Sequence, residues 1–258
     1  MKTLCDTTLT ALITGAGSGI GAALAKSLGS AGMRVVVSDL NLQAAEQVAG
    51  ELQELGCLAE TLELDVTQQR QIDAVADYHT PIDILINNAG LQHVARLEAF
   101  PPEQWRLLIE VLLVGPAMLA RAVLPSMKQN NFGRIINIGS IHALVASPFK
   151  SAYVAAKHGI LGFSKALALE TAEFDVTVNT LCPSYVKTPL VEHQIAQQAQ
   201  EHGMSEDEVI NKIMLEPMPK KSFIDMDELA GTIDYLISDA AKNVTGQSIV
   251  LDGGWTAR

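Results

Sequence analysis

Short apolar runs and amphipathic segments alternate along the chain. About seven of the apolar runs have the length of buried strands. They occupy residues 9–14, 34–40, a stretch ending at 62–66, 82–90, 134–140, 176–183 and 248–255. Segments with helical spacing lie between them, at residues 22–32, 42–55, 107–124, 153–170 and 226–238. This alternation predicts an α/β fold with a Rossmann-like, doubly wound parallel sheet, whose ligands bind at the carboxyl ends of the strands.

The segment from residue 188 to about 223 departs from this alternation. It is polar, rich in Gln and Glu, and has helical spacing without any strand pattern. Because it is too long for an ordinary connection, we expect a helical lid over the substrate. No linker or repeat interrupts the chain, so residues 1–258 are expected to form a single domain.

Glycines follow the first predicted strand in the run TGAGSGIG (14–21). Gly15, Gly19 and Gly21 would let the backbone turn tightly and approach a pyrophosphate at the start of the next helix. The second strand ends in Asp39, eighteen residues after Gly21. A carboxylate there accepts hydrogen bonds from ribose hydroxyls and repels a 2′-phosphate, and no Arg or Lys lies nearby to bind one. The expected cofactor is therefore NAD.

Two further strand ends carry small or polar residues. Asp65, after the third strand, could contact the adenine edge or equally cap the next turn. The fourth strand ends in Asn87, Asn88, Ala89 and Gly90, where a flat ring could lie against the backbone.

A hydroxyl, a phenol and an ammonium group are predicted to converge at the same edge of the sheet. Ser140 ends the apolar run RIINIGS, while Tyr153 and Lys157 lie four residues apart on one helix face. A phenol titrates near pH ~10, so a neighbouring cation is needed to favour the phenolate. This set suits proton transfer to and from an alcohol or ketone.

The composition of the chain limits the kinds of partner and the cellular compartment that we expect. The net charge is −11 and basic residues do not cluster, which argues against nucleic acid and anionic membranes as partners. Cys5, Cys57 and Cys182 are far apart and show no metal-ligand spacing, so we expect no metal and free thiols in a reducing compartment. The N-terminus has no signal-peptide pattern, and residues 107–124 are interrupted by polar residues, glycine and proline. A cytoplasmic protein is expected.

These motifs together resemble the short-chain dehydrogenase/reductase family. TGAGSGIG (14–21), NNAG (87–90), Ser140, the pair Tyr153 and Lys157, and CP (182–183) with TP (188–189) occur in the family's order over essentially the whole chain. The resemblance implies Ser140, Tyr153 and Lys157 as catalytic residues, with Tyr153 as general acid/base. The implied cofactor-binding residues are Thr14, Gly15, Gly17, Ser18, Gly19, Ile20, Gly21, Asp39, Leu64, Asp65, Val66, Asn88, Ala89, Gly90, Tyr153, Lys157, Pro183, Val186 and Thr188.

Other segments narrow the resemblance within the family. SIHALVAS (140–147), AAKHG (155–159), TPLVEHQI (188–195) and DGGW (252–255) look like the bacterial branch that acts on (R)-3-hydroxybutyrate. This implies reversible, NAD-dependent oxidation of a small 3-hydroxy acid to its 3-oxo acid by a homotetramer. The implied substrate-binding residues are Gln92, Ser140, His142, Lys150, Tyr153, Tyr185, Gln194 and Trp255, with Lys150 supplying the cation that a small acid needs.

Three residues depart from the family pattern. Leu112 stands where many members carry Asn in the proton relay, Ser184 replaces the usual Gly, and Tyr185 stands where this branch commonly has Trp. A proline removes the helical hydrogen bond to the carbonyl four residues back. We therefore hypothesise that Pro116 frees the Leu112 carbonyl to hold the relay water; otherwise Leu112 only packs.

Two alternatives remain from the sequence. The chain could be a related dehydrogenase or reductase for another hydroxy or keto substrate, or a non-catalytic NAD-binding protein. Asp39 and Lys150 speak against the first alternative, and the intact set of Ser140, Tyr153 and Lys157 speaks against the second.

Overall fold

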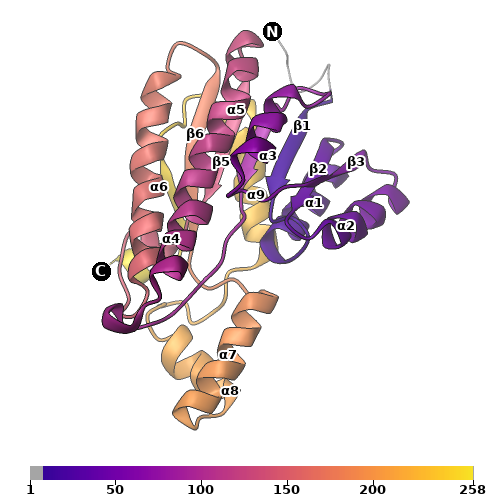
Figure 1. Cartoon of the computed structure of the whole chain (residues 1–258). Coiled ribbons are helices and arrows are strands. Elements are labelled where there is room, and N and C mark those ends of the chain that lie inside the picture. Colours follow the sequence, from indigo (N-terminus) through magenta and orange to yellow (C-terminus); the bar gives the residue numbers. More distant parts are fainter. Residues whose placement is uncertain (1–7, 258) are drawn as a thin grey trace.

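Seven strands form one parallel sheet in the computed structural model, which describes residues 8–257 (Figure 1). The strand order is β3-β2-β1-β4-β5-β6-β7. The strands are β1 (Thr10–Thr14), β2 (Arg34–Asp39), β3 (Ala59–Glu63), β4 (Ile84–Asn87), β5 (Gly133–Ile138), β6 (Val176–Pro183) and β7 (Ser248–Leu251). The predicted doubly wound parallel sheet is confirmed. Its winding direction reverses between β1 and β4, so a crevice opens where their carboxyl-end loops diverge.

Helices cover both faces of the sheet (Figure 1). One face is packed by α1 (Gly19–Ser30), α2 (Leu42–Glu54) and α9 (Met226–Ile237), the other by α3 (Gln69–Ala74), α5 (Gly115–Gln129) and α6 (Ser151–Glu170). The chain also forms α4 (Pro102–Ile109), α7 (Pro189–His202) and α8 (Glu206–Val209), the π-helical turns η3 (Glu110–Val114) and η5 (Ile210–Met214), and 3-10 turns η1 (Val75–Asp77), η2 (Leu97–Ala99), η4 (Ile141–Ala143), η6 (Asp239–Ala241) and η7 (Trp255–Ala257).

Burial on both faces explains why the strands read as continuous apolar runs. Every residue of β1, β4, β5 and β6 is buried. Such strands have no solvated face on which polar residues could alternate. Two asparagines inside these strands bond to each other and to a helix: Asn87 donates to Asn137 (2.8 Å), and Asn137 donates to the Ser164 hydroxyl of α6 (2.9 Å).

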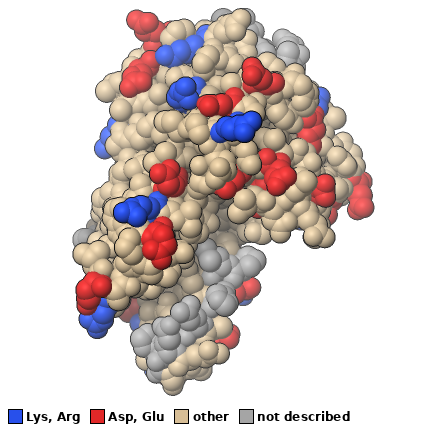
Figure 2. All heavy atoms as spheres, viewed as in Figure 1, with Lys and Arg blue, Asp and Glu red and all other residues tan. Residues whose placement is uncertain are grey.

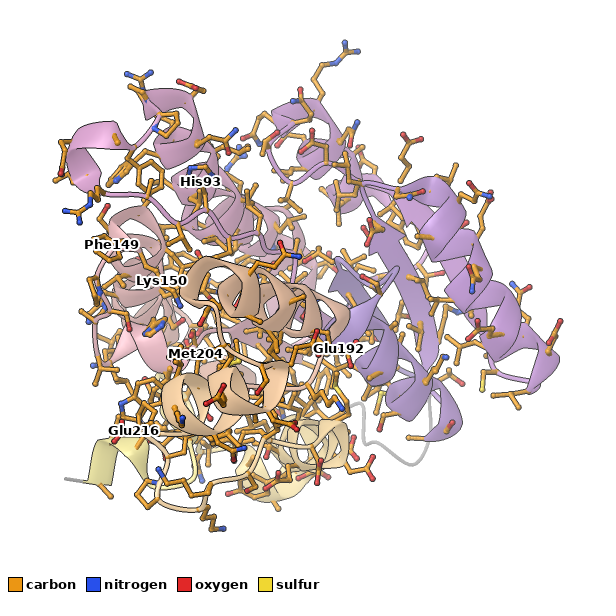
Figure 3. The ribbon with its side chains drawn as sticks, turned by 90° about the horizontal axis from the view of Figure 1, so that it is seen from below. His93, Phe149, Lys150, Glu192, Met204 and Glu216 are labelled. Atoms are coloured by element: carbon orange, nitrogen blue, oxygen red, sulfur yellow. The ribbon has the colours of Figure 1, made fainter. Side chains whose placement is uncertain are left out.

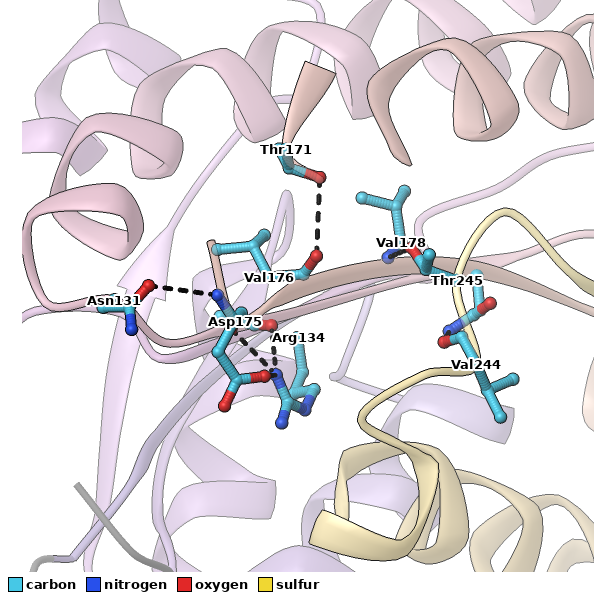
Figure 4. Close-up of polar contacts among 10 residues, drawn as sticks. Asn131, Arg134, Thr171, Asp175, Val176, Val178, Val244 and Thr245 are labelled. Atoms are coloured by element: carbon cyan, nitrogen blue, oxygen red, sulfur yellow. Dashed lines mark hydrogen bonds and ion pairs between the residues drawn. The ribbon is translucent and has the colours of Figure 1, made fainter. Parts of the chain in front are cut away.

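A buried arginine bonds to the turn before β6 at the amino ends of the strands, opposite the crevice (Figure 4). Arg134 is fully buried, and its Nη1 donates to the side chain (2.9 Å) and the carbonyl (3.0 Å) of Asp175. Its guanidinium carbon lies 4.5 Å from the centroid of the Phe132 ring. Asn131 accepts the Asp175 N–H (3.1 Å), so the turn before β6 is tied to the turn before β5. Polar bonds therefore fix the amino ends of β5 and β6, and the site lies at the opposite, carboxyl ends of the strands.

The most apolar helical stretch runs through α4, η3 and α5. Residues Pro102–Gln129 are long and apolar enough to cross a membrane, with a mean hydropathy of 2.1 over the most apolar window. A core helix passes the same test, and half of that window is buried inside the protein. The stretch packs against α6 through Leu108 and Leu112, as a core or interface helix does.

The segment expected to be a lid contains α7, α8 and η5. It lies beyond the carboxyl ends of the strands (Figure 1) and has a small core of its own, made by Ile195, Val209 and Met214. A parallel bridge pairs Val186 with Ile224, at the two ends of the segment. Its helical nature agrees with the sequence pattern, while its action as a lid stays a prediction.

Basic and acidic side chains are mixed on the face of the molecule drawn in Figure 2. The Lys and Arg side chains there are separated by Asp and Glu, and they form no continuous basic patch. Cys57 and Cys182 are free thiols, and Cys5 lies outside the described residues.

Candidate active site

The loops after β1 and β4 are bonded to each other across the crevice. The Thr14 hydroxyl accepts the N–H groups of Asn88 (3.1 Å) and Ala89 (3.0 Å). The Asn88 amide in turn donates to the carbonyls of Thr14 (2.9 Å) and Gly15 (3.0 Å). Thr14 and Asn88 therefore set the width of the crevice.

The glycine loop needs its glycines at two positions. Gly15 has a φ of +63°, and a Cβ there would lie 2.8 Å from the Ala89 Cα. A Cβ on Gly21 would lie 2.4 Å from the Gly15 carbonyl oxygen. The cap residue of α1, Ser18, makes no side-chain bond to the first N–H groups of that helix. Those groups remain available to an anion such as a pyrophosphate.

Asp39 is locked in place at the end of β2. Its Oδ2 accepts the Gly17 N–H (2.9 Å), and its Oδ1 accepts the Asn41 N–H (2.9 Å). A Cβ on Gly17 would lie 2.9 Å from the same Oδ2, so this glycine permits the contact. Each carboxylate oxygen keeps a lone pair that can accept from a ribose hydroxyl.

Asp65 closes the turn that follows β3. Its Oδ1 accepts the backbone N–H (2.9 Å) and the hydroxyl (2.7 Å) of Thr67. Of the two roles that the sequence left open, the structure shows turn capping. Asp65 also lines the cavity described next.

A cavity of about 700 Å³ runs along the carboxyl edge of the sheet. Most of the predicted residues line it: Gly15, Ser18, Gly19, Ile20, Asp39, Leu64, Asp65, Val66, Asn88, Ala89, Gly90, Gln92, Ser140, His142, Lys150, Tyr153, Lys157, Pro183, Tyr185, Val186, Thr188 and Gln194. Thr14, Gly17, Gly21 and Trp255 do not line the cavity and shape it from behind.

Sequence reasoning missed most of the apolar wall. The additional lining residues are Leu40, Thr67, Leu91, Leu107, Val111, Ile138, Gly139, Ile141 and Val191, and Leu112 and Ser184, noted only as departures, line it as well. Leu107 and Val111 are four residues apart, so helical spacing could have paired them on one face. Nothing in the sequence shows which face of that helix meets the cavity.

The three predicted catalytic residues meet at the end of β5. Ser140 follows β5, and its hydroxyl accepts the His142 N–H (3.1 Å). Lys157 is buried; its Nζ donates to the Ile138 carbonyl (2.6 Å) and lies 5.6 Å from the centroid of the Tyr153 ring.

Burial changes the acidity of both α6 side chains. It lowers the pKa of Lys157 to about 8, because desolvation disfavours the ammonium. Burial likewise raises the pKa of Tyr153, while the hydrogen bond from Ser140 lowers it. The Cys182 thiol faces the same group, and burial raises its pKa. The set therefore combines a protonated phenol, a hydroxyl and an ammonium that titrates close to neutral pH.

Lys150 lines the cavity next to His142. Its Nζ lies 3.5 Å from His142 Nε2, and burial lowers its pKa. Among the side chains that the structure describes, no carboxylate lies within 4.0 Å of this ammonium. The pKa of His142 is lowered to about 4, first by burial and then by the Lys150 charge, so its ring is neutral at pH 7.

The contact with Lys150 selects a tautomer of His142. An ammonium group only donates, so a hydrogen bond between these two atoms requires Nε2 as the acceptor and the ring proton on Nδ1, which is buried and has no hydrogen-bond partner among the described residues. We expected His142 to add a donor for the substrate. In this arrangement its Nε2 instead accepts from Lys150 and orients the lysine.

Aromatic rings form the wall next to His142. Tyr185 stacks on Trp255 with ring centroids 6.1 Å apart, and the His142 ring lies nearly perpendicular to the rings of Tyr153 and Trp255, with its centroid 6.1 Å from each of theirs. Trp255, predicted to touch the substrate, thus supports Tyr185 and His142 from behind.

Comparisons with known proteins identify the family. Residues 9–199 match the short chain dehydrogenase family. Over 97% of its length, the chain is 47% identical to the D-beta-hydroxybutyrate dehydrogenase of Rhizobium meliloti, of which it covers 100%. It is 43% identical to the enzyme of that name from Cupriavidus necator, covering 96% of this chain and 98% of that one. A solved structure of an actinorhodin polyketide ketoreductase variant with NADPH superposes with a TM-score of 0.91 and 33% identity, covering 97% of this chain and 98% of that one.

The chain belongs to the short-chain dehydrogenase family. It is an oxidoreductase with the fold that the sequence predicts. Among the side chains of this dehydrogenase that the structure describes, no three from His, Cys, Asp or Glu are placed to share a metal ion.

The helix that carries Leu112 changes its hydrogen bonding at this residue. In η3 the Gly115 N–H donates to the Glu110 carbonyl, five residues back instead of four. Pro116 follows and has no N–H to donate to Leu112. The Leu112 side chain is buried beside Gly90, lining the dehydrogenase site.

Removal of the buried ammonium should change both activity and stability. In Lys157→Met we expect loss of dehydrogenase activity and, at pH 7, an unfolding free energy higher by about 1–3 kcal/mol. The folded-state pKa of about 8 lies below the ordinary 10.5, so wild-type stability rises between these pH values. The advantage of the variant should accordingly shrink between pH 8 and 10.5, as measured by denaturant unfolding.

Lys165→Met is the matched control, because it removes an exposed lysine of the same helix. If Lys157→Met unfolds more easily than wild type at pH 7, or its advantage does not depend on pH, burial of the Lys157 charge is not costly.

Proposed function

We propose that this dehydrogenase catalyses the reversible, NAD-dependent oxidation of (R)-3-hydroxybutyrate, or a close short-chain 3-hydroxy acid, to its 3-oxo acid. The observation that carries the proposal is the Lys150 ammonium, which lines the cavity of Tyr153 and has no carboxylate partner among the described side chains. A partly buried, unpaired cation favours an anionic ligand. The two relatives named D-beta-hydroxybutyrate dehydrogenase support the choice of acid.

The substrate carboxylate would be held at the Lys150 end of the cavity. Lys150 supplies the charge, and the amides of Gln92 and Gln194 supply neutral donors. The Gln92 Oε1 is buried and has no hydrogen-bond partner within the described chain; because it is an acceptor, only the Nε2 of this amide can donate to a carboxylate. Tyr185, backed by Trp255, forms the wall for the short alkyl chain.

The chemistry divides among three residues. NAD, when bound, supplies the hydride acceptor. Ser140 and Tyr153 bind the reacting oxygen, and the Tyr153 phenolate takes the hydroxyl proton during oxidation. Lys157 stabilises that phenolate, since its ammonium lies 5.6 Å from the ring centroid. Because Tyr153 must be deprotonated, we expect oxidation to be faster at alkaline pH.

NAD is proposed over NADP because of charge at the adenosine end. The Asp39 carboxylate is fixed by two backbone N–H groups and lies where a 2′-phosphate would meet it. Lys150 and Lys157 are the lysines lining the described cavity, no arginine lines it, and both lie at the catalytic end. A 2′-phosphate would thus meet repulsion without a compensating cation.

Initial rates test this proposal directly. With (R)-3-hydroxybutyrate we expect NAD to be reduced, with kcat/KM at least about 100-fold above that for NADP or for the (S) enantiomer, since each tenfold corresponds to about 1.4 kcal/mol. The methyl ester of the same acid lacks the negative charge and should lose about tenfold or more in kcat/KM. Absence of turnover, alongside tight NADH binding, would point to another substrate or to a binding protein.

We further propose that the Leu112 carbonyl, left without a donor by Pro116, holds the relay water beside Lys157. The support is the π-helical turn immediately before Pro116. Pro116→Ala restores an N–H that can bond to Leu112, so we expect kcat for oxidation to fall about tenfold near pH 7. NADH affinity should not change.

Pro125→Ala is the control for this experiment. Pro125 lies inside the same helix and is exposed, away from the cavity. A wild-type pH profile in Pro116→Ala would show that Leu112 only packs.

We also propose that the protein is a cytoplasmic homotetramer. Half of the most apolar window of Pro102–Gln129 is not buried within the protomer, and Leu169 of the neighbouring α6 is 80% exposed. Pairing of these helices with a second copy would cover that surface. Sedimentation equilibrium should give a species of four chains, and a monomer at micromolar concentration would contradict the proposal.

A further inference from the structure

Phe149 has a backbone conformation that its side chain does not favour. Its φ is +67°, in the left-handed region where bulky residues are rare. The side chain is 47% exposed, so burial of the ring in the core does not explain the conformation. Phe149 does not line the cavity, whereas the next residue, Lys150, does.

The loop of residues 91–96 holds Phe149 in this conformation. The Ala95 N–H donates to the Phe149 carbonyl (3.0 Å), and the guanidinium carbon of Arg96 lies 5.3 Å from the centroid of the Phe149 ring. One contact fixes the backbone and the other fixes the ring. Figure 3 shows the molecule from below. It labels Phe149 and Lys150, which precede α6, and His93, which belongs to the loop of residues 91–96.

The same loop carries Gln92. Residues 91–96 continue from Gly90, and Gln92 lines the cavity with a buried, unpartnered Oε1. The bond between Ala95 and Phe149 therefore joins the segment that bears Gln92 to the segment that bears Lys150.

The backbone conformation of Phe149 sets the direction in which the side chain of the next residue, Lys150, projects. Lys150 is the cap residue of α6, and its carbonyl accepts the Val154 N–H (2.9 Å). Its backbone is thus fixed by the helix on one side and by Phe149 on the other. With that backbone, Nζ reaches within 3.5 Å of His142 Nε2 inside the cavity.

We propose that Phe149 is a positioning residue for the substrate carboxylate. Its left-handed backbone, clamped by Ala95 and Arg96, holds Lys150 and Gln92 at the spacing that a carboxylate requires. A strained conformation maintained by its surroundings is a known form of preorganisation. This inference rests on the proposed carboxylate-binding function of Lys150.

The test compares an acid with its neutral ester. In Phe149→Ala, which loses the ring contact, we expect KM for (R)-3-hydroxybutyrate to rise about tenfold, with kcat within about twofold of wild type. KM for the methyl ester and the affinity for NADH should not change. Arg96→Ala should raise KM for the acid by about threefold, and the double variant should add little, because both changes break one clamp.

Phe149→Gly separates strain from clamping. Glycine adopts a positive φ without penalty, so this variant should unfold no more easily than Phe149→Ala. Its KM for the acid should nevertheless be at least as high, because the ring contact with Arg96 is absent. Leu144→Ala is the matched control, since Leu144 is an exposed apolar residue of the same region that does not line the cavity.

Unchanged KM for the acid in Phe149→Ala and Arg96→Ala would overturn the inference. An equal rise in KM for acid and ester, or a parallel fall in kcat, would also overturn it, because a general structural defect has that effect. Lys150→Met serves as the reference. If it leaves KM for the acid unchanged, the carboxylate site itself is wrong, whereas a large effect in Lys150→Met alone refutes only the role of Phe149.

Discussion

Two ammonium groups face one cavity, and neither has a carboxylate within 4.0 Å among the described residues. Such charges are costly to remove from water unless other groups hydrogen-bond to them. Lys157 donates to the Ile138 carbonyl, and the Lys150 ammonium lies beside the His142 ring nitrogen Nε2. These two acceptors belong to the end of β5 and to the turn η4, and Ser140 lies between them in the chain.

The charges in the cavity are separated along the sheet edge. Asp39 ends β2 and Asp65 follows β3, while Lys157 donates to the Ile138 carbonyl of β5. Neighbouring strands are about 4.8 Å apart, so these carboxylates lie on the order of 15 Å or more from Lys157. At that separation the attraction between opposite charges is only about 1 kcal/mol at an effective dielectric constant of about 20. Each end keeps its own electrostatic character, so a neutral ribose suits one end and an anion suits the other.

The sequence revealed those parts of the site that depend on local pattern. Strand ends, the glycine loop and the helical spacing of Tyr153 and Lys157 follow from periodicity, and their places at the carboxyl edge follow from the parallel topology. The apolar wall of Leu107 and Val111 does not follow, because it depends on how one helix rotates against another. The partner of Lys157 is a backbone carbonyl, which no residue type identifies. The left-handed Phe149 is equally invisible, since its sequence favours no positive φ.

Tyr185 connects the aromatic wall of the cavity to the helical segment that we expect to be a lid. It packs against the main core through Trp255 and also against the separate core of Ile195, Val209 and Met214. The Ile224 N–H donates to the Tyr185 carbonyl (2.9 Å), so the two ends of this segment are tied together at one place. The segment is also held elsewhere, because Leu215 and Met218 are buried in the main core and the Lys220 N–H donates to the Gly253 carbonyl (3.1 Å). Val191 and Gln194 line the cavity from the part of the segment that has its own core, so the attachments at Tyr185 and Gly253 help to fix where these two residues lie.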